Sequence, residues 1–168
     1  IIALFYTADL ALPWLGGAFA ILAALVILGR MRVHALWPYL LLAFVVVAAD
    51  QATKLAVLDH FTVGERLAVL PGLFDLTLVF NRGAAFSFLA SHDGWQRWFF
   101  AGIATVASLF IGYLLLRHRG QRAFSVALGL ILGGAVGNLI DRLIYGQVVD
   151  FLLVYRGDWY FPAFNAAD

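Results

Sequence analysis

The stretch that decides the fold covers residues 123–142 and reads AFSVALGLILGGAVGNLIDR. Residues 123–140 of it contain no Asp, Glu, Lys or Arg, and this length is close to the roughly 20 apolar residues that cross a bilayer as a helix. Within it Gly129, Gly133 and Gly137 recur at every fourth position, so on a helix they form one stripe that lets a second helix approach closely. The stretch therefore predicts a membrane-spanning helix that packs against another helix through its glycines.

Three further runs are comparably apolar and predict three more spans. They cover Leu10–Gly29, Met31–Ala49 apart from Arg32, and Trp98–Leu116. The chain of 168 residues is 64% hydrophobic and only 12% charged, so a water-soluble domain of this size would lack the polar residues to cover its surface. We therefore expect a mainly α-helical, polytopic membrane protein. Because there is no cysteine and the four histidines lack the spacing of metal ligands, we expect no metal site and no cofactor.

The arginines of two short loops predict the orientation in the membrane. Residues 30–34 and 117–122 connect the predicted spans and contain five arginines but no carboxylate. By the positive-inside rule both loops face the cytoplasm, which places the carboxylates and the long segment 59–96 at the opposite side. We therefore expect any chemistry to take place at the extracytoplasmic face.

The segment between the second and third spans predicts a small β-sheet or hairpin. Leu67–Leu70 and Leu73–Phe80 are rich in β-formers, and Pro71-Gly72 between them is a turn signal. We expect this hairpin on the outer membrane surface. Aromatic side chains near the predicted span ends are expected to contact membrane lipids at headgroup level; they are Trp95, Trp98, Trp159, Tyr160 and Phe161.

Several polar residues lie unexpectedly close to the apolar spans. Asp50 and Lys54 are four positions apart, so on a helix they can form an ion pair that either braces the bundle or contacts a substrate. Asn138, Asp141 and Arg142 gather on one face at the end of the fourth span. For Asp141 and Arg142 the spacing favours a pair at the membrane interface.

Two carboxylates stand in apolar surroundings without a nearby cation. Asp150 lies in Val148–Val154, which reads VVDFLLV, and Asp168 ends Phe161–Asp168, which reads FPAFNAAD. Two such groups brought close together cannot both ionise easily, so they would share a proton as in an aspartic protease. The spacing alone does not show whether they meet in space.

Five blocks of the chain, taken together, resemble the signature blocks of the lipoprotein signal peptidases, also called signal peptidase II. The blocks follow one another over residues 40–168 and read DQATK (50–54), NRGAAFS (81–87), GGAVGNLIDR (133–142), VVDF (148–151) and FNAAD (164–168). The resemblance implies a membrane aspartic endopeptidase of the bacterial cytoplasmic (inner) membrane. Its substrate would be a prolipoprotein whose cysteine already carries a diacylglyceryl group, cleaved on the amino side of that cysteine.

The resemblance also assigns roles by position. The two catalytic aspartates of the family fall on Asp150 and Asp168. Positions that line the substrate pocket fall on Asp50, Lys54, Asn81, Gly134, Asn138, Arg142 and Asn165, while Asp141 and Gly83 would support them. We expect no nucleic-acid partner and a monomeric enzyme.

Two departures from the family pattern concern the ends of the chain. The family has a span after the Asn-x-Ala-Asp block, so we expect the natural chain to continue beyond Asp168. The segment 1–34 is an additional span with its cytoplasmic loop, and residues 35–168 form the peptidase domain.

A proton-coupled transporter or channel is the main alternative function. Asp50, Lys54, Asp141 and Arg142 would then form an ion path. These charges gather at one face of the membrane, however, instead of crossing it.

Overall fold

The computed structural model describes residues 36–83, 95–118 and 120–168. The predicted span Leu10–Gly29 lies outside these residues. The chain divides into two compact units, Ile1–Trp37 and Pro38–Asp168. The second unit contains all the candidate site residues, together with a small β-sheet.

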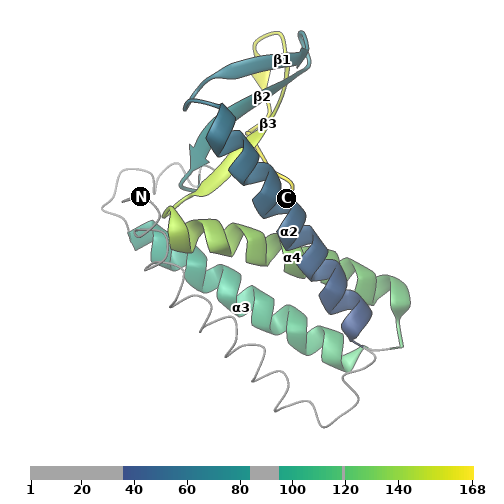
Figure 1. Cartoon of the computed structure of the whole chain (residues 1–168). Coiled ribbons are helices and arrows are strands. Elements are labelled where there is room, and N and C mark those ends of the chain that lie inside the picture. Colours follow the sequence, from purple (N-terminus) through teal and green to yellow (C-terminus); the bar gives the residue numbers. More distant parts are fainter. Residues whose placement is uncertain (1–35, 84–94, 119) are drawn as a thin grey trace. The chain divides into compact units, whose positions relative to one another are not determined.

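Three helices of the described residues are long and apolar enough to cross a membrane. They are α2 (Trp37–His60), α3 (Trp95–Arg117) and α4 (Arg122–Ile144) (Figure 1). Helices are thus confirmed for the predicted spans at 98–116 and 123–140 and for residues 37–49 of the predicted span at 31–49, whose residues 31–35 lie outside the described residues. Helix α2 continues past Ala49 to His60, so Asp50 and Lys54 lie within it instead of at its end.

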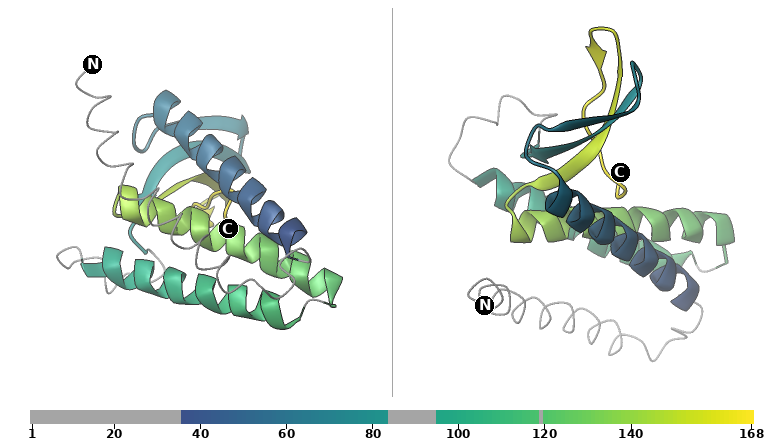
Figure 2. Two further views of the ribbon diagram at one scale, coloured as in Figure 1. Left: turned by 60° about the horizontal axis from the view of Figure 1, so that its bottom comes forward. Right: turned by 45° about the horizontal axis from the view of Figure 1, so that its top comes forward.

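The glycine stripe of α4 packs against α2, as predicted. A Cβ placed on Gly133 would lie 2.6 Å from Val46 Cβ and 2.8 Å from the Ala43 carbonyl oxygen, and one on Gly129 would lie 2.9 Å from the Tyr39 carbonyl oxygen. Any side chain at these positions would push the two helices apart. On another side α4 runs alongside α3 (Figures 1 and 2).

A four-stranded antiparallel sheet follows the order β1-β2-β3-β4. The predicted hairpin is confirmed as β1 (Arg66–Leu70) and β2 (Phe74–Asn81), with Gly72 at a φ of 82° in the turn, a value that glycine adopts without steric cost. The strands β3 (Val148–Arg156) and β4 (Trp159–Tyr160) were not predicted from the sequence. Strand β3 pairs with β2 over residues far apart in the sequence, which no local pattern reveals.

The sheet packs against helix α2 through a shared apolar core. Val57 from α2, Leu78 from β2, and Val149 and Phe151 from β3 are buried together. Helix α2 leads into β1, and α4 leads into β3 after a short turn. The C-terminal ends of α2 and α4 therefore both lie next to the sheet. The candidate site lies at this junction.

Candidate active site

Strand β3 places Asp150 in the interior, where only 1% of the residue is exposed. Both of its carboxyl oxygens accept amide N–H donors: Oδ2 from Asn81 Nδ2 at 2.8 Å and Oδ1 from Asn165 Nδ2 at 2.7 Å. Burial raises the pKa of Asp150 from 3.8 to about 6, because the two amide hydrogen bonds offset the cost of burying charge only in part. The negative charge of Asp168 raises this pKa further, and the positive charge of Lys54 lowers it by a smaller amount. Asp150 is thus a carboxyl that takes up a proton unusually readily.

The C-terminal segment brings Asp168 to the same place. Phe164 pairs with Leu152 of β3, which lays this segment beside the strand and buries Asn165. The exposed Asp168 carboxylate accepts from Asn138 Nδ2 at 2.8 Å and from the Asn165 backbone N–H at 3.2 Å. Asn165 therefore bonds to Asp150 through its side chain and to Asp168 through its backbone, so both carboxylates lie around one asparagine.

Gly134 is needed for this approach. A Cβ at this position would overlap the carbonyl oxygen of Ala167, the residue before Asp168. The segment that carries Asp168 can therefore lie directly on α4 only where the helix has no side chain.

A second group of charged residues lies between α2 and α4. Lys54 Nζ is 2.7 Å from Asp50 Oδ2 and 2.8 Å from Asp141 Oδ2, and it donates to Asn138 Oδ1 at 3.0 Å. Asp50 and Asp141 are 0% exposed and Lys54 is 1% exposed. The predicted Asp50–Lys54 pair is confirmed. We call Asp50, Lys54 and Asp141 the charge cluster.

The predicted interfacial pair of Asp141 with Arg142 is wrong. Asp141 points into the protein, where it also accepts N–H groups from Gln51 at 2.9 Å and from the Val149 backbone at 3.0 Å. Arg142 donates instead to the Asn138 carbonyl at 3.1 Å, and its guanidinium lies 5.6 Å from the centre of the Phe100 ring. Adjacent residues on a helix point in different directions, so each finds a partner elsewhere.

Gly83 orients Asn81. Its backbone N–H donates to Asn81 Oδ1 at 2.8 Å, which turns the NH₂ end of that amide towards Asp150. The φ of Gly83 is 106°, and a Cβ here would lie 2.5 Å from the Phe100 ring. A glycine is required at this position both for its backbone conformation and for space.

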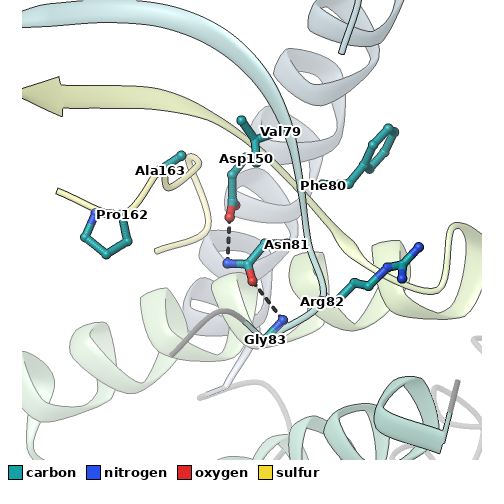
Figure 3. Close-up of a pocket in the computed structure, with 8 residues that line it drawn as sticks. All are labelled: Val79, Phe80, Asn81, Arg82, Gly83, Asp150, Pro162 and Ala163. Atoms are coloured by element: carbon teal, nitrogen blue, oxygen red, sulfur yellow. Dashed lines mark hydrogen bonds between the residues drawn. The ribbon is translucent and has the colours of Figure 1, made fainter. Parts of the chain in front are cut away.

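A cavity of about 280 Å³ opens beside Asp150. Figure 3 shows Asn81 facing the Asp150 carboxyl group, with Pro162 and Ala163 on the other side. Asn81, Gly83 and Asp150 were predicted from the sequence to belong to the site, but the other lining residues were missed; they are Val79, Phe80, Arg82, Pro162 and Ala163. Gln51 was also missed, although it stands within the DQATK block. Within the described parts of the chain, no group of three or more His, Cys, Asp or Glu residues could hold a metal ion.

Comparison with known families identifies the chain. The sequence profile of the family described as signal peptidase (SPase) II matches residues 42–168, which is more than half of the sequence. The chain belongs to the signal peptidase II family. It is accordingly a membrane protease of the lipoprotein-processing class.

Individual relatives agree with the family. The lipoprotein signal peptidase of Ralstonia nicotianae is 54% identical over 135 residues, which cover 80% of this chain and 78% of that protein. The lipoprotein signal peptidase of Burkholderia mallei is 56% identical over 134 residues, covering 80% of each chain. A bacterial membrane enzyme solved by the in meso method at 1.9 Å resolution is 32% identical, with a TM-score of 0.68, covering 78% of this chain and 83% of that one.

The N-terminal part matches a second family. The profile described as Na+/H+ antiporter 1 matches residues 1–54. This match overlaps the signal peptidase match only from residue 42 to residue 54. It includes Asp50, Gln51 and Lys54 but none of the other candidate site residues.

Proposed function

We propose that this chain is an aspartic endopeptidase that cleaves diacylglyceryl-modified prolipoproteins on the amino side of the lipidated cysteine. Asp150 and Asp168 would activate the attacking water. The observation that carries the proposal is the bridge through Asn165, which hydrogen-bonds to one carboxylate with its side chain and to the other with its backbone. Two acids held this close share a proton more readily than they carry two charges.

The two carboxyl groups differ in a way that suits acid and base roles. Asp150 is buried and its pKa is raised to about 6, so it is the group that holds the shared proton more readily. Asp168 is exposed and serves as the base. Asp168 takes a proton from water, the resulting oxygen attacks the scissile carbonyl carbon, and Asp150 gives its proton to the carbonyl oxygen.

Collapse of the resulting tetrahedral diol completes the reaction. The C–N bond breaks, and the departing nitrogen takes a proton from the Asp168 carboxyl group, while the diol proton returns to Asp150. The products are a signal peptide with a free carboxyl group and a lipidated cysteine with a free amino group. The chain's own side chains carry every proton transfer in this scheme.

The architecture supports a substrate anchored in the membrane. The sheet and the site lie where α2 and α4 end, while the short connection between α3 and α4 contains Arg117 and Arg122 at the opposite ends of those helices. Positive charge in such a connection favours the cytoplasmic side. We therefore place the site at the outer face of the inner membrane, where a precursor held by its lipid could reach it, and we expect the enzyme to act as a monomer among membrane lipids.

We further propose that residues 35–168 form the peptidase domain and that residues 1–34 are an additional unit. The signal peptidase match starts at residue 42, and the compact unit that contains the site starts at Pro38. The antiporter match favours a separate origin for the N-terminal part.

A cleavage assay in detergent tests the proposal. The substrates are a diacylglyceryl-modified prolipoprotein and its unlipidated form, and the enzymes are the wild type, Asp150→Asn and Asp168→Asn. We expect the wild type to cleave only the lipidated form and each variant to lose at least about 10⁴-fold in kcat, as when a catalytic acid or base is removed. Cleavage that persists in both variants would refute the dyad.

The same variants discriminate a transporter from a peptidase. An ion path through Asp50 and Lys54, which lie in the antiporter match, does not need Asp150 or Asp168. Ion flux into proteoliposomes that survives both substitutions, together with absent cleavage by the folded wild type, would favour transport.

A further inference from the structure

Lys54 uses its whole hydrogen-bonding capacity inside the protein. An ammonium group has three N–H donors and no acceptor, and Lys54 Nζ has three oxygen neighbours: Asp50 Oδ2 at 2.7 Å, Asp141 Oδ2 at 2.8 Å and Asn138 Oδ1 at 3.0 Å. Its side chain is only 2% exposed. The described residues that line the cavity beside Asp150 do not include it. The ammonium therefore has neither a free donor nor surface for a substrate.

The third of these bonds holds the Asn138 amide from the side opposite to Asp168. The oxygen and NH₂ ends of an amide have nearly the same shape, so the hydrogen-bond partners determine its orientation. Because Lys54 can only donate, the oxygen of Asn138 must face it, and the NH₂ group then faces Asp168 Oδ1 at 2.8 Å.

Asn165 continues the same chain of bonds. Its Nδ2 donates to Asn138 Oδ1 at 3.1 Å and to Asp150 Oδ1 at 2.7 Å. A flipped Asn138 would present NH₂ to the NH₂ of Asn165 and an oxygen to the Asp168 carboxylate. Both contacts would be repulsive, so Lys54, Asn165 and Asp168 all favour one orientation of Asn138. Through this amide Lys54 is connected to both candidate catalytic acids.

We propose that Lys54 is a positioning residue for the peptidase reaction, which fixes the Asn138 amide so that it donates to Asp168, and that it does not contact substrate. This assignment rests on the proposed function and replaces the substrate-pocket role expected for Lys54. Removal of the Lys54 ammonium should slow the chemical step, because the base that takes the proton from water would no longer be held in place. Substrate binding should stay intact, because Lys54 does not contact substrate.

The test compares Lys54→Met, Asn138→Leu and the double variant in cleavage of the diacylglyceryl-modified prolipoprotein. Each single substitution should lower kcat about 100-fold with KM within about threefold of the wild type. The double variant should be within about threefold of the slower single variant, because both substitutions break one chain of contacts. Asp59→Asn is the matched control, since it removes a charge from the same helix where the side chain is 83% exposed, and its kcat should equal that of the wild type.

Lys54→Met leaves Asp50 and Asp141 without their cation, so a second variant secures the test if the first does not fold. Lys54→Met/Asp50→Asn removes one cation and one anion together and leaves the net charge of the cluster unchanged. It should show the same fall in kcat with the same KM. In an inactive Asp150→Asn background, a fluorescent diacylglyceryl lipopeptide should bind with and without Lys54→Met at Kd values within about threefold.

Two results would overturn the assignment. One is a kcat within about threefold of the wild type in the Lys54 variants; the other is a rise of about tenfold or more in KM or in the lipopeptide Kd with kcat unchanged, which would make Lys54 a substrate contact. A wild type that cannot cleave would instead overturn the proposed function, so the two failures are distinguishable.

Discussion

The charge cluster and the Asp150–Asp168 pair lie in one connected set of hydrogen bonds, yet their acids are stabilised in opposite ways. Asp50 and Asp141 share the cation Lys54 at 2.7 and 2.8 Å. The hydrogen bonds that the described residues give to Asp150 and Asp168 come only from amide N–H groups. A cation fixes the charge of its partners as well as their position, whereas neutral amides fix position and leave the proton free to move. The cluster is therefore suited to support, and the pair to proton transfer.

The largest expected difference between the two regions is in stability. Lys54→Met should lower the free energy of unfolding at pH 7 by about 3–5 kcal/mol, because it leaves two buried carboxylates uncompensated. Asp168→Asn should change it by about 1 kcal/mol or less, because Asp168 is exposed and the substitution removes one of its two hydrogen bonds. Unfolding of the detergent-purified variants, followed by tryptophan fluorescence, measures both.

The double variant Lys54→Met/Asp50→Asn is the control for this comparison. It should recover more than half of the lost stability, since only one carboxylate then remains buried without a cation. Equal losses in Lys54→Met and Asp168→Asn would contradict the division between a supporting cluster and a reactive pair.

The sequence predicted those parts of the molecule that depend on local spacing. The helices were predicted from apolar runs, the β1–β2 hairpin from its Pro71-Gly72 turn, and the Asp50–Lys54 pair from residues four apart on one helix face. Their apolar surroundings singled out Asp150 and Asp168, and family resemblance assigned them as the catalytic pair. Their approach, however, depends on the pairing of β3 with β2 and of Phe164 with Leu152. Such pairings join distant parts of the chain, so no local pattern contains them.

The wrong prediction for Asp141 has the same origin. Arg142 is its neighbour in sequence, but Lys54 approaches from another helix because glycines allow α2 to lie against α4. At Gly137 a Cβ would lie 2.5 Å from Asp50 Oδ2. The partner of a buried charge is thus set by which helices can pack closely, and that is a property of the fold.

The pH dependence of stability gives a second, slightly smaller contrast. In the folded state the pKa of Asp150 is raised from 3.8 to about 6. A carboxyl group of this kind stabilises the fold while it is protonated, so its contribution is complete below about pH 4 and is lost as the pH rises through 6. At about 1.4 kcal/mol for each pH unit between the two pKa values, the loss amounts to about 3 kcal/mol.

Asp150→Asn isolates this contribution. The asparagine cannot ionise, so relative to the wild type its free energy of unfolding should gain about 3 kcal/mol between pH 4 and pH 7.5. A constant offset is also expected, because the new NH₂ group meets the donor of either Asn81 or Asn165. The slope of the difference against pH is therefore the measurement, and a difference that does not vary with pH would show that Asp150 is not held in a charge-disfavouring site.

A third substitution separates shape from charge. Gly134→Ala changes no charge, but its methyl group would displace the Ala167 carbonyl and with it the segment that carries Asp168. A displacement of about 1 Å in a catalytic group costs roughly 100-fold in rate, so we expect kcat to fall by about that factor while the charge cluster stays intact.

Gly112→Ala makes the same change in α3, where nothing lies within 4 Å of the added Cβ, and should leave kcat unchanged. If Gly134→Ala also kept full activity, the Asp150–Asp168 pair would tolerate movement. The proposal that fixed amide donors hold this pair for catalysis would then be wrong. Loss of activity in Gly134→Ala alone would show that the pair depends on close packing against α4 in addition to its hydrogen bonds.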